Sequence, residues 1–211
     1  LEFDVAPNYG NGMIEEIFAD IIKYNNTKLI INTKCGNSIK NIKSYKEQDI
    51  IESLNRSLES LKAINILYLH NPRNEVKDIN SLIDLIIKFK KQGLIKYAGI
   101  SFARNHYFEK KYVNKLDYIQ DEFNLLHCKN IPILKKFDCK IIARSPLASG
   151  VLSGNLNADR VFETQDYRYS WLKEERLQSI IFQIKELEKI INNDIRKYSK
   201  YFVLSHPLIN K

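Results

Sequence analysis

The feature that most constrains the fold is a repeated alternation between short apolar runs and longer segments of helical periodicity. Apolar runs occupy residues 3–6, 28–32, 64–69, 97–101, 116–120 and 140–143. Between most of them, apolar side chains recur every three or four positions, as on one face of a helix. Continuous apolar strands separated by amphipathic helices are typical of parallel sheets built from βαβ units. The chain is therefore predicted to be an α/β protein with six complete or nearly complete strands.

The helical segments follow the same pattern along the whole chain. They are expected at residues 13–22, 50–61, 79–91, 130–137, 177–191 and 195–204. Gly93 follows the third of them and is a typical helix stop. Residues 208–210 are expected to begin a further strand. Because no linker or change in composition interrupts the pattern, residues 1–211 are predicted to form a single domain.

Composition excludes several classes of function. The formal net charge is +8, but the lysines are dispersed along helices, so no nucleic-acid partner is expected. No apolar run reaches the roughly 18–20 residues that a membrane-spanning helix needs. The three cysteines and four histidines have no metal-ligand spacing, so no metal site is predicted. An odd number of cysteines without a disulfide pattern favours a cytoplasmic location.

The residues that end the strands carry the functional signal. In order they are Asp4, Lys34, His70, Ser101, Gln120 and Arg144. Each follows a hydrophobic run, and each can make a strong hydrogen bond or carry charge. In a parallel α/β barrel these strand ends converge on one face, where the active site lies. Six such residues in succession therefore indicate a shared site.

Each residue taken alone also has an ordinary structural explanation. Asp4 is suited to begin a turn with the following Pro and Asn. Lys34 is compatible with a solvated loop, and His70 with a core position whose ring is satisfied by the backbone. Tyr9 is one of twelve tyrosines and would be unremarkable on the surface. Their common place in the βα repeat is what favours a functional interpretation.

Chemistry gives a joint purpose to four of these side chains: Asp4, Tyr9, Lys34 and His70. A tyrosine hydroxyl titrates near pH ~10 and is a slow proton donor at neutral pH. A nearby ammonium favours the phenolate and so makes the phenol a better acid. A carboxylate holds the ammonium, and an imidazole can orient a carbonyl oxygen. Together they suit the protonation of an oxygen while hydride arrives at its carbon.

At this point the sequence resembles the aldo-keto reductases. FDVAPNYGNG (3–12) is similar to that family's D-x-A-x-x-Y-G segment. LIINTKCG (29–36) and ILYLHNP (66–72) resemble the strands that end in its catalytic Lys and His. The remaining similar segments are IKYAGISF (95–102), YIQDEFNLLH (118–127) and IIARSPLASGVLSG (141–154).

The resemblance implies a TIM (β/α)8 barrel that binds NADP(H) and reduces small-molecule carbonyl substrates. Tyr9 would be the general acid, supported by Lys34 and Asp4, with His70 orienting the substrate. The expected cofactor-binding residues are Ser101 and Gln120, which would hold the nicotinamide carboxamide, and Arg144, Ser145, Leu147 and Gly150, which would contact the rest of the cofactor.

The sequence departs from the family pattern in three respects. Phe102 stands where the family commonly has Asn, and Arg144 replaces an aromatic residue, although a guanidinium can also stack on a flat ring. The barrel is expected to be incomplete: the family's first βα unit would precede Leu1, and its eighth strand would end beyond Lys211. An alternative function is therefore a truncated, catalytically impaired barrel that acts as a binding or interaction protein.

The long loop at residues 155–171 has two explanations. Tyr167, Tyr169 and Trp171 could form the wall of a substrate or cofactor cleft, or could pack the loop onto the barrel. The sequence does not choose between them.

Overall fold

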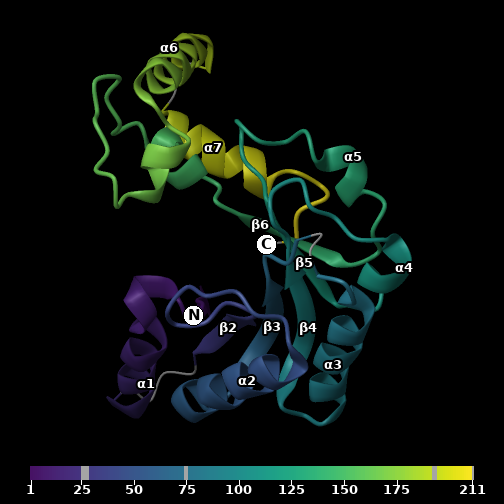
Figure 1. Ribbon diagram of the computed structural model, residues 1–211. Helices are drawn as coiled ribbons and strands as arrows, with labels where there is room; N and C mark the ends of the chain where they lie inside the picture. Colours follow the sequence, from purple (N-terminus) through teal and green to yellow (C-terminus); the bar gives the residue numbers. More distant parts are fainter. Residues whose placement is uncertain (25–28, 74–75, 192–193, 211) are drawn as a thin grey trace. The chain divides into compact units, whose positions relative to one another are not determined.

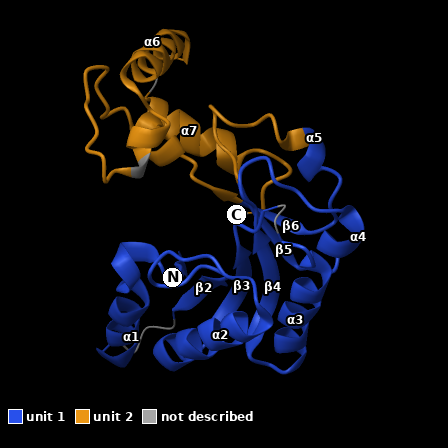
Figure 2. Cartoon of the chain, viewed as in Figure 1, with its two compact units in different colours: residues 1–121, 132–142 blue, residues 122–131, 143–211 orange. Residues whose placement is uncertain are grey.

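The computed structural model describes residues 1–24, 29–73, 76–191 and 194–210 (Figure 1). The chain divides into two compact units, which Figure 2 shows in different colours. Unit 1 comprises residues 1–121 and 132–142, and unit 2 comprises residues 122–131 and 143–211.

Within the described residues, six strands form one sheet whose spatial order follows the sequence. The strands are β1 (Glu2–Asp4), β2 (Ile30–Cys35), β3 (Ile64–His70), β4 (Ile95–Ser101), β5 (Tyr118–Glu122) and β6 (Lys140–Arg144). The pairs from β1 to β5 are parallel. Doubly wound sheets reverse their strand order at a switch point, whereas a barrel wall keeps it. The fold is therefore an incomplete (β/α)8 barrel, which confirms the sequence-based prediction.

The principal helices of unit 1 are α1 (Ile14–Tyr24), α2 (Glu47–Leu61) and α3 (Ile79–Lys91). Figure 1 shows α2 and α3 against the same face of the sheet. The side chain of Asp78 caps the start of α3 by accepting from the Ser81 N–H at 2.9 Å. Gly93 lies just beyond the end of α3 with φ of 75°, as expected of a helix stop. The shorter helices are α4 (Lys110–Val113) and α5 (Ile131–Leu134).

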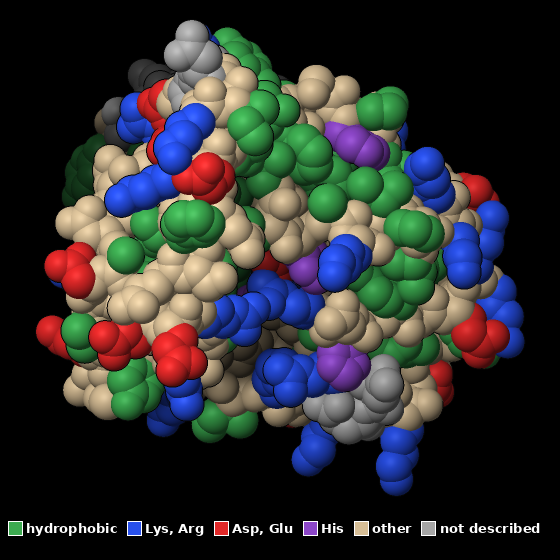
Figure 3. Space-filling view, turned by 90° about the horizontal axis from the view of Figure 1, so that it is seen from above, with side chains coloured by type: hydrophobic (Ala, Val, Ile, Leu, Met, Phe, Trp, Pro, Cys, Tyr) green, Lys and Arg blue, Asp and Glu red, His purple; other side chains and the backbone are tan. Residues whose placement is uncertain are grey.

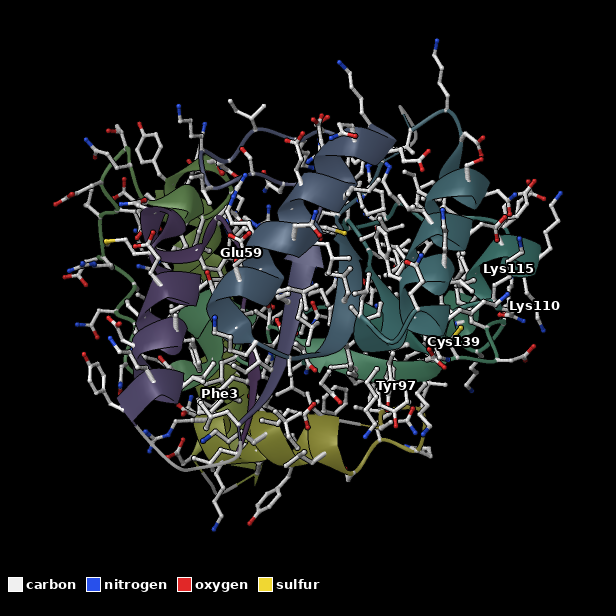
Figure 4. All side chains as sticks on the ribbon, turned by 90° about the horizontal axis from the view of Figure 1, so that it is seen from below. Phe3, Glu59, Tyr97, Lys110, Lys115 and Cys139 are labelled. Carbon is white, nitrogen blue, oxygen red and sulfur yellow. The ribbon has the colours of Figure 1, made fainter. Side chains whose placement is uncertain are left out.

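The two faces of the sheet pack differently. On one face of the sheet, Ile66, Tyr68, Tyr118 and Ile142 form a buried cluster. Tyr97, labelled in Figure 4, packs edge to face against Tyr118 with ring centroids 5.3 Å apart. Aromatic pairs of this geometry add to the stability gained from burial alone.

Unit 2 contains α6 (Glu174–Ile191), α7 (Ile195–Leu204) and the short turns η2 (Ala148–Ser153) and η3 (Tyr167–Ser170). Its core forms where the η2 turn meets the apolar faces of both helices. The buried members are Ala148, Val151, Leu152, Phe162, Leu172, Leu177, Ile181, Ile184 and Ile195. Unit 2 thus has an apolar core of its own.

Several strand boundaries differ from the sequence-based prediction. Strand β1, predicted at residues 3–6, covers Glu2–Asp4, and β4 begins at Ile95 instead of residue 97. Strand β2 begins at Ile30 and continues to Cys35, although the apolar run suggested residues 28–32; residue 28 lies outside the described residues. Strand β5 likewise ends at Glu122 instead of residue 120. Both strands extend through buried polar residues such as Asn32 and Asp121, which hydropathy counts as strand ends.

The expected strand at residues 208–210 is wrong. The Leu208 N–H donates to Nδ1 of His206 at 3.3 Å, and the Ile209 N–H donates to the His206 carbonyl at 2.9 Å. These bonds make a turn and occupy the N–H groups that a strand would use to pair. Apolar character alone therefore misjudged this segment.

No helix in the described part of the chain is long and apolar enough to cross a membrane. In Figure 3, Lys and Arg side chains lie interspersed with acidic and apolar ones on the face shown.

Candidate active site

Strand register places the predicted site residues of unit 1 in neighbouring positions. Lys34 pairs with Tyr68, His70 pairs with Ser101, and Ser101 pairs with Gln120. Residues in register on parallel strands point to the same side of the sheet, because side chains alternate with a period of two. The strand ends of β2, β3, β4 and β5 therefore present their polar groups on one face.

Lys34 is the centre of this group and has no exposed surface. Its ammonium donates to the Asp4 carboxylate and, at 2.8 Å, to the backbone carbonyl of Val5. The Asp4 side chain is 35% exposed, so the pair lies at the boundary between core and solvent. A buried charge is tolerated only when it is paired and hydrogen-bonded, and both conditions hold here.

Tyr9 reaches the same place from the turn after β1. Its N–H donates to the Ala6 carbonyl at 3.0 Å, and the next residue, Gly10, has φ of 56°, a conformation that glycine adopts readily. The Lys34 ammonium nitrogen lies 4.9 Å from the centroid of the Tyr9 ring. Because 37% of Tyr9 is exposed, a molecule in solution can reach this side chain.

His70 completes the group at the end of β3. It is 5% exposed, and its ring lies edge to face with that of Tyr9, with centroids 6.1 Å apart. The Tyr45 hydroxyl donates to the His70 backbone carbonyl at 2.7 Å and so fixes the chain at the strand end. The four residues predicted to be catalytic are thus brought together in unit 1.

Ser101 and Gln120 join the group through a line of hydrogen bonds. The Ser101 hydroxyl donates to Oε1 of Gln120 at 2.9 Å, and Nε2 of Gln120 donates to Oδ2 of Asp4 at 2.8 Å. One carboxylate oxygen of Asp4 therefore serves Lys34 and the other serves Gln120. This line fixes the orientation of the Gln120 amide.

Phe102, which replaces the family's usual Asn, belongs to the core. It is fully buried, and its ring lies 5.1 Å from that of Tyr107 and 5.8 Å from that of Phe137. Its side chain therefore fills space between β4 and the segment before β6 and offers no polar group.

The predicted cofactor-binding residues Arg144, Ser145, Leu147 and Gly150 lie in unit 2, at and after the end of β6. Ser145 has φ of 55°, and its carbonyl accepts from the Ala148 N–H at 2.9 Å. Gly150 has φ of 91°, and its N–H donates to the Leu147 carbonyl at 3.0 Å. The segment is therefore a tight turn held by its own backbone.

Arg168 supports this turn from η3. Its guanidinium donates to both carboxylate oxygens of Asp166, and Nη1 donates to the Ser149 carbonyl at 3.4 Å. The guanidinium holds the pKa of Asp166 near 2, below the usual range, because it donates to that carboxylate. Sequence analysis gave Arg168 no role.

The loop at residues 155–171 lines two open cavities of about 580 and 860 Å³ within unit 2. Tyr169 and Trp171 line the larger one, and the side chain of Tyr167 lies outside the described part of the structure. Phe162 lines both cavities and is also buried in the core of unit 2. The loop therefore combines a packing role with an exposed aromatic wall.

A buried carboxyl group behind β2 was missed by sequence analysis. Glu15, in the first turn of α1, is 5% exposed and accepts from the Thr33 hydroxyl at 2.6 Å and from the Ser57 hydroxyl at 3.0 Å. Burial raises the pKa of Glu15, and the bonds from both hydroxyls oppose the rise. The signal was its spacing: Glu15 lies three residues before Phe18, on the face of α1 that packs inward.

Among the residues that the structure describes, no cluster of three or more His, Cys, Asp or Glu side chains could hold a metal ion.

A barrel wall with ionisable groups at its carboxyl edge defines a class of (β/α)8 proteins, and comparison with known proteins specifies the family. The aldo/keto reductase family model matches residues 2–207, so the chain belongs to the aldo/keto reductase family.

Two curated relatives show how much of such a protein the chain spans. It is 31% identical to "Uncharacterized oxidoreductase YqkF" of Bacillus subtilis over 166 residues, covering 71% of this chain and 52% of the relative. It is 27% identical to a "Probable voltage-gated potassium channel subunit beta" of Oryza sativa over 196 residues, covering 79% of this chain and 58% of that protein. The chain thus spans little more than half the length of these relatives.

Solved structures agree on the fold. The glycerol dehydrogenase AKR11B4 from Gluconobacter oxydans matches with a TM-score of 0.78 and 21% identity, over 99% of this chain and 69% of that one. The aldo-keto reductase AKR11C1 from Bacillus halodurans, in its holo form, matches with a TM-score of 0.72 and 20% identity, over 99% of this chain and 70% of that one.

Proposed function

We propose that the protein is an NADP(H)-dependent oxidoreductase that reduces the carbonyl groups of small aldehydes and ketones to alcohols. The observation that carries this proposal is the fully buried Lys34 ammonium, held by Asp4 and lying 4.9 Å from the Tyr9 ring. An ammonium fixed beside a partly exposed phenol is the arrangement that makes the phenol a usable acid.

The roles of the four residues follow from their positions. The Tyr9 hydroxyl donates its proton to the carbonyl oxygen of the substrate. The Lys34 ammonium stabilises the phenolate that forms, and the Asp4 carboxylate binds the ammonium and holds it in place. The His70 imidazole, at the next strand end, donates a hydrogen bond that orients the carbonyl oxygen.

NADPH, when bound, supplies the hydride. Ser101 and Gln120 fit its carboxamide chemically, because a hydroxyl and an amide at neighbouring strand ends offer both donors and acceptors. In this proposal Arg144 stacks on the nicotinamide, and the turn formed by Ser145, Leu147 and Gly150 contacts the rest of the cofactor. The proposal also treats residues 1–211 as parts of one barrel domain.

The test is NADPH binding and turnover of a panel of aldehydes by the wild-type protein and by Tyr9→Phe. General acid catalysis contributes about 10²–10⁴-fold, so Tyr9→Phe should lower kcat at least about 100-fold and leave the Kd for NADPH unchanged. The matched control is Tyr24→Phe, at a tyrosine that is 74% exposed on α1, and it should behave as wild type. A wild-type protein that neither binds NADPH nor turns over any aldehyde would refute the proposal.

The second candidate is a catalytically impaired barrel that acts as a binding or interaction protein. The similarity to a probable potassium channel subunit beta favours it, since that name describes a protein that assembles with others. NADPH binding without turnover of any aldehyde, together with wild-type behaviour of Tyr9→Phe, would favour this second function.

A further inference from the structure

Tyr68 is a buried aromatic residue that the proposed mechanism does not use. It lies in β3 with no exposed surface, and it is the direct register partner of Lys34 on β2. Residues in register on neighbouring parallel strands point to the same face of the sheet, so the side chains of Tyr68 and Lys34 are neighbours on that face.

Gly99 provides the space in which the Tyr68 ring lies. A Cβ atom at position 99 would come within 2.6 and 2.8 Å of two ring carbons of Tyr68, and within 3.1 Å of the Tyr118 carbonyl oxygen. Any side chain at this position would push the ring away. Ile66 and Ile142 pack in the same cluster, so the ring is confined.

Two aromatic rings therefore lie near the Lys34 ammonium. Its nitrogen lies 6.0 Å from the centroid of Tyr68 and 4.9 Å from that of Tyr9. An ammonium over the face of an aromatic ring is attracted to it, and the attraction is larger when water is excluded. Lys34 is fully buried, so the second condition is met.

The contribution of Tyr68 comes from its ring. Its hydroxyl is buried and makes no hydrogen bond within the described residues. Burial strongly raises the pKa of this phenol, and the Asp4 charge adds to the rise, so the side chain stays neutral. The Tyr68 side chain can therefore influence the Lys34 ammonium only through the packing of its ring and through the π face of that ring.

We propose that Tyr68 is a positioning residue for the reaction. Its ring packs against Gly99 and holds the Lys34 ammonium beside Tyr9. The inference rests on the proposed function, because it assigns Lys34 the task of stabilising the Tyr9 phenolate. It predicts that the ring is needed and the hydroxyl is not.

The kinetic test compares Tyr68→Phe, which keeps the ring, with Tyr68→Leu, which removes it. Tyr68→Leu should lower kcat about tenfold with the Kd for NADPH within about twofold of wild type, whereas Tyr68→Phe should keep kcat within about twofold. Tyr97→Leu is the matched control, since Tyr97 packs on the same cluster but is no register partner of Lys34. If Tyr68→Leu fails to fold, Tyr68→Met fills the space with a flexible side chain and makes the same comparison.

A second measurement does not depend on activity. In a ¹⁵N-lysine NMR spectrum, the Lys34 ammonium is assigned as the signal that Lys34→Met removes. Loss of the Tyr68 ring should shift this signal by removing a ring current, while Tyr68→Phe and Tyr97→Leu should leave it in place.

The two measurements separate the failure of the inference from that of the proposed function. An inactive wild-type protein whose ammonium signal moves only in the variants that lack the Tyr68 ring refutes the function and supports the positioning of Lys34 by Tyr68. An active wild-type protein whose kcat and ammonium signal are both unaffected by Tyr68→Leu overturns the positioning. Equal loss in Tyr68→Phe and Tyr68→Leu would also overturn it, because the hydroxyl would then be the active part.

Discussion

Removing the charge of Asp4 should destabilise the protein, because the fully buried Lys34 ammonium would lose its carboxylate partner. Breaking a fully buried ion pair costs about 3–5 kcal/mol. The Asp4 side chain is 35% exposed, so the lower end of this range applies. Asp4→Asn also disturbs the bond from Gln120, because an Asn amide has one acceptor oxygen where the carboxylate offers two. We expect a loss of about 3 kcal/mol in the free energy of unfolding.

The pairwise part of this loss is measured by a double-mutant cycle of Asp4→Asn and Lys34→Met, using urea unfolding followed by circular dichroism. The coupling energy should be about 2 kcal/mol or more, and it should persist in 0.5 M salt because buried pairs are poorly screened. The matched control is the exposed pair of Lys115 and Asp84, with an N–O distance of 2.8 Å; Lys115 is labelled in Figure 4. Such surface pairs couple by about 0–1 kcal/mol. A coupling energy at Asp4 no larger than that of the control would refute the reasoning.

Three further predictions concern residues around the site. Burial raises the pKa of Glu15 above its ordinary value of 4.5, so the stabilising contribution of this carboxyl group is complete below pH 4.5 and is lost as the pH rises through the folded-state pKa. In urea unfolding at several pH values, Glu15→Gln should therefore gain stability relative to wild type as the pH rises across this window. A difference that stays constant with pH would contradict the raised pKa of Glu15. Gly99→Ala should destabilise the protein by about 1–3 kcal/mol, because the new methyl group would overlap the Tyr68 ring, and Tyr68→Leu in the same chain should recover part of the loss in thermal unfolding. Arg168→Ala should weaken NADPH binding about three- to tenfold in a fluorescence titration, because the Ser149 carbonyl would lose its hydrogen bond from Arg168. An unchanged Kd would show that the η2 turn keeps its conformation without Arg168.

The sequence predicted the sheet well because its strands are continuous apolar runs. All six strands were found in the expected order, and the helix that ends before Gly93 runs over residues 79–91 as expected. Strands β2 and β5 were predicted to end too early because hydropathy treats a polar residue as the end of a strand. β2 continues through Asn32 and Lys34, which are buried but hydrogen-bonded inside the sheet. The strand expected at residues 208–210 was wrong for another reason, since apolar character alone suggested it.

The candidate site was predicted only in part. Asp4, Tyr9, Lys34 and His70 were expected to meet because each lies at or just after a strand end. Residues that support this group, such as Tyr68, do not lie at a strand end, so this criterion does not find them. Tyr68 reads as one more apolar position in its strand, and its role depends on a glycine 31 positions later in the chain.

The line of hydrogen bonds from Ser101 through Gln120 to Asp4 has a consequence for folding kinetics. Asp4 and Gln120 are 116 positions apart, so their bond closes a very long loop. Such contacts form late in folding, because the chain loses the entropy of loop closure before the contact can stabilise the folded state. Local helices such as α3 can form early, whereas the two oxygens of Asp4 find both partners only when β1, β2 and β5 have been placed in the sheet. During refolding, helical circular dichroism should therefore recover before the Lys34 ammonium is enclosed.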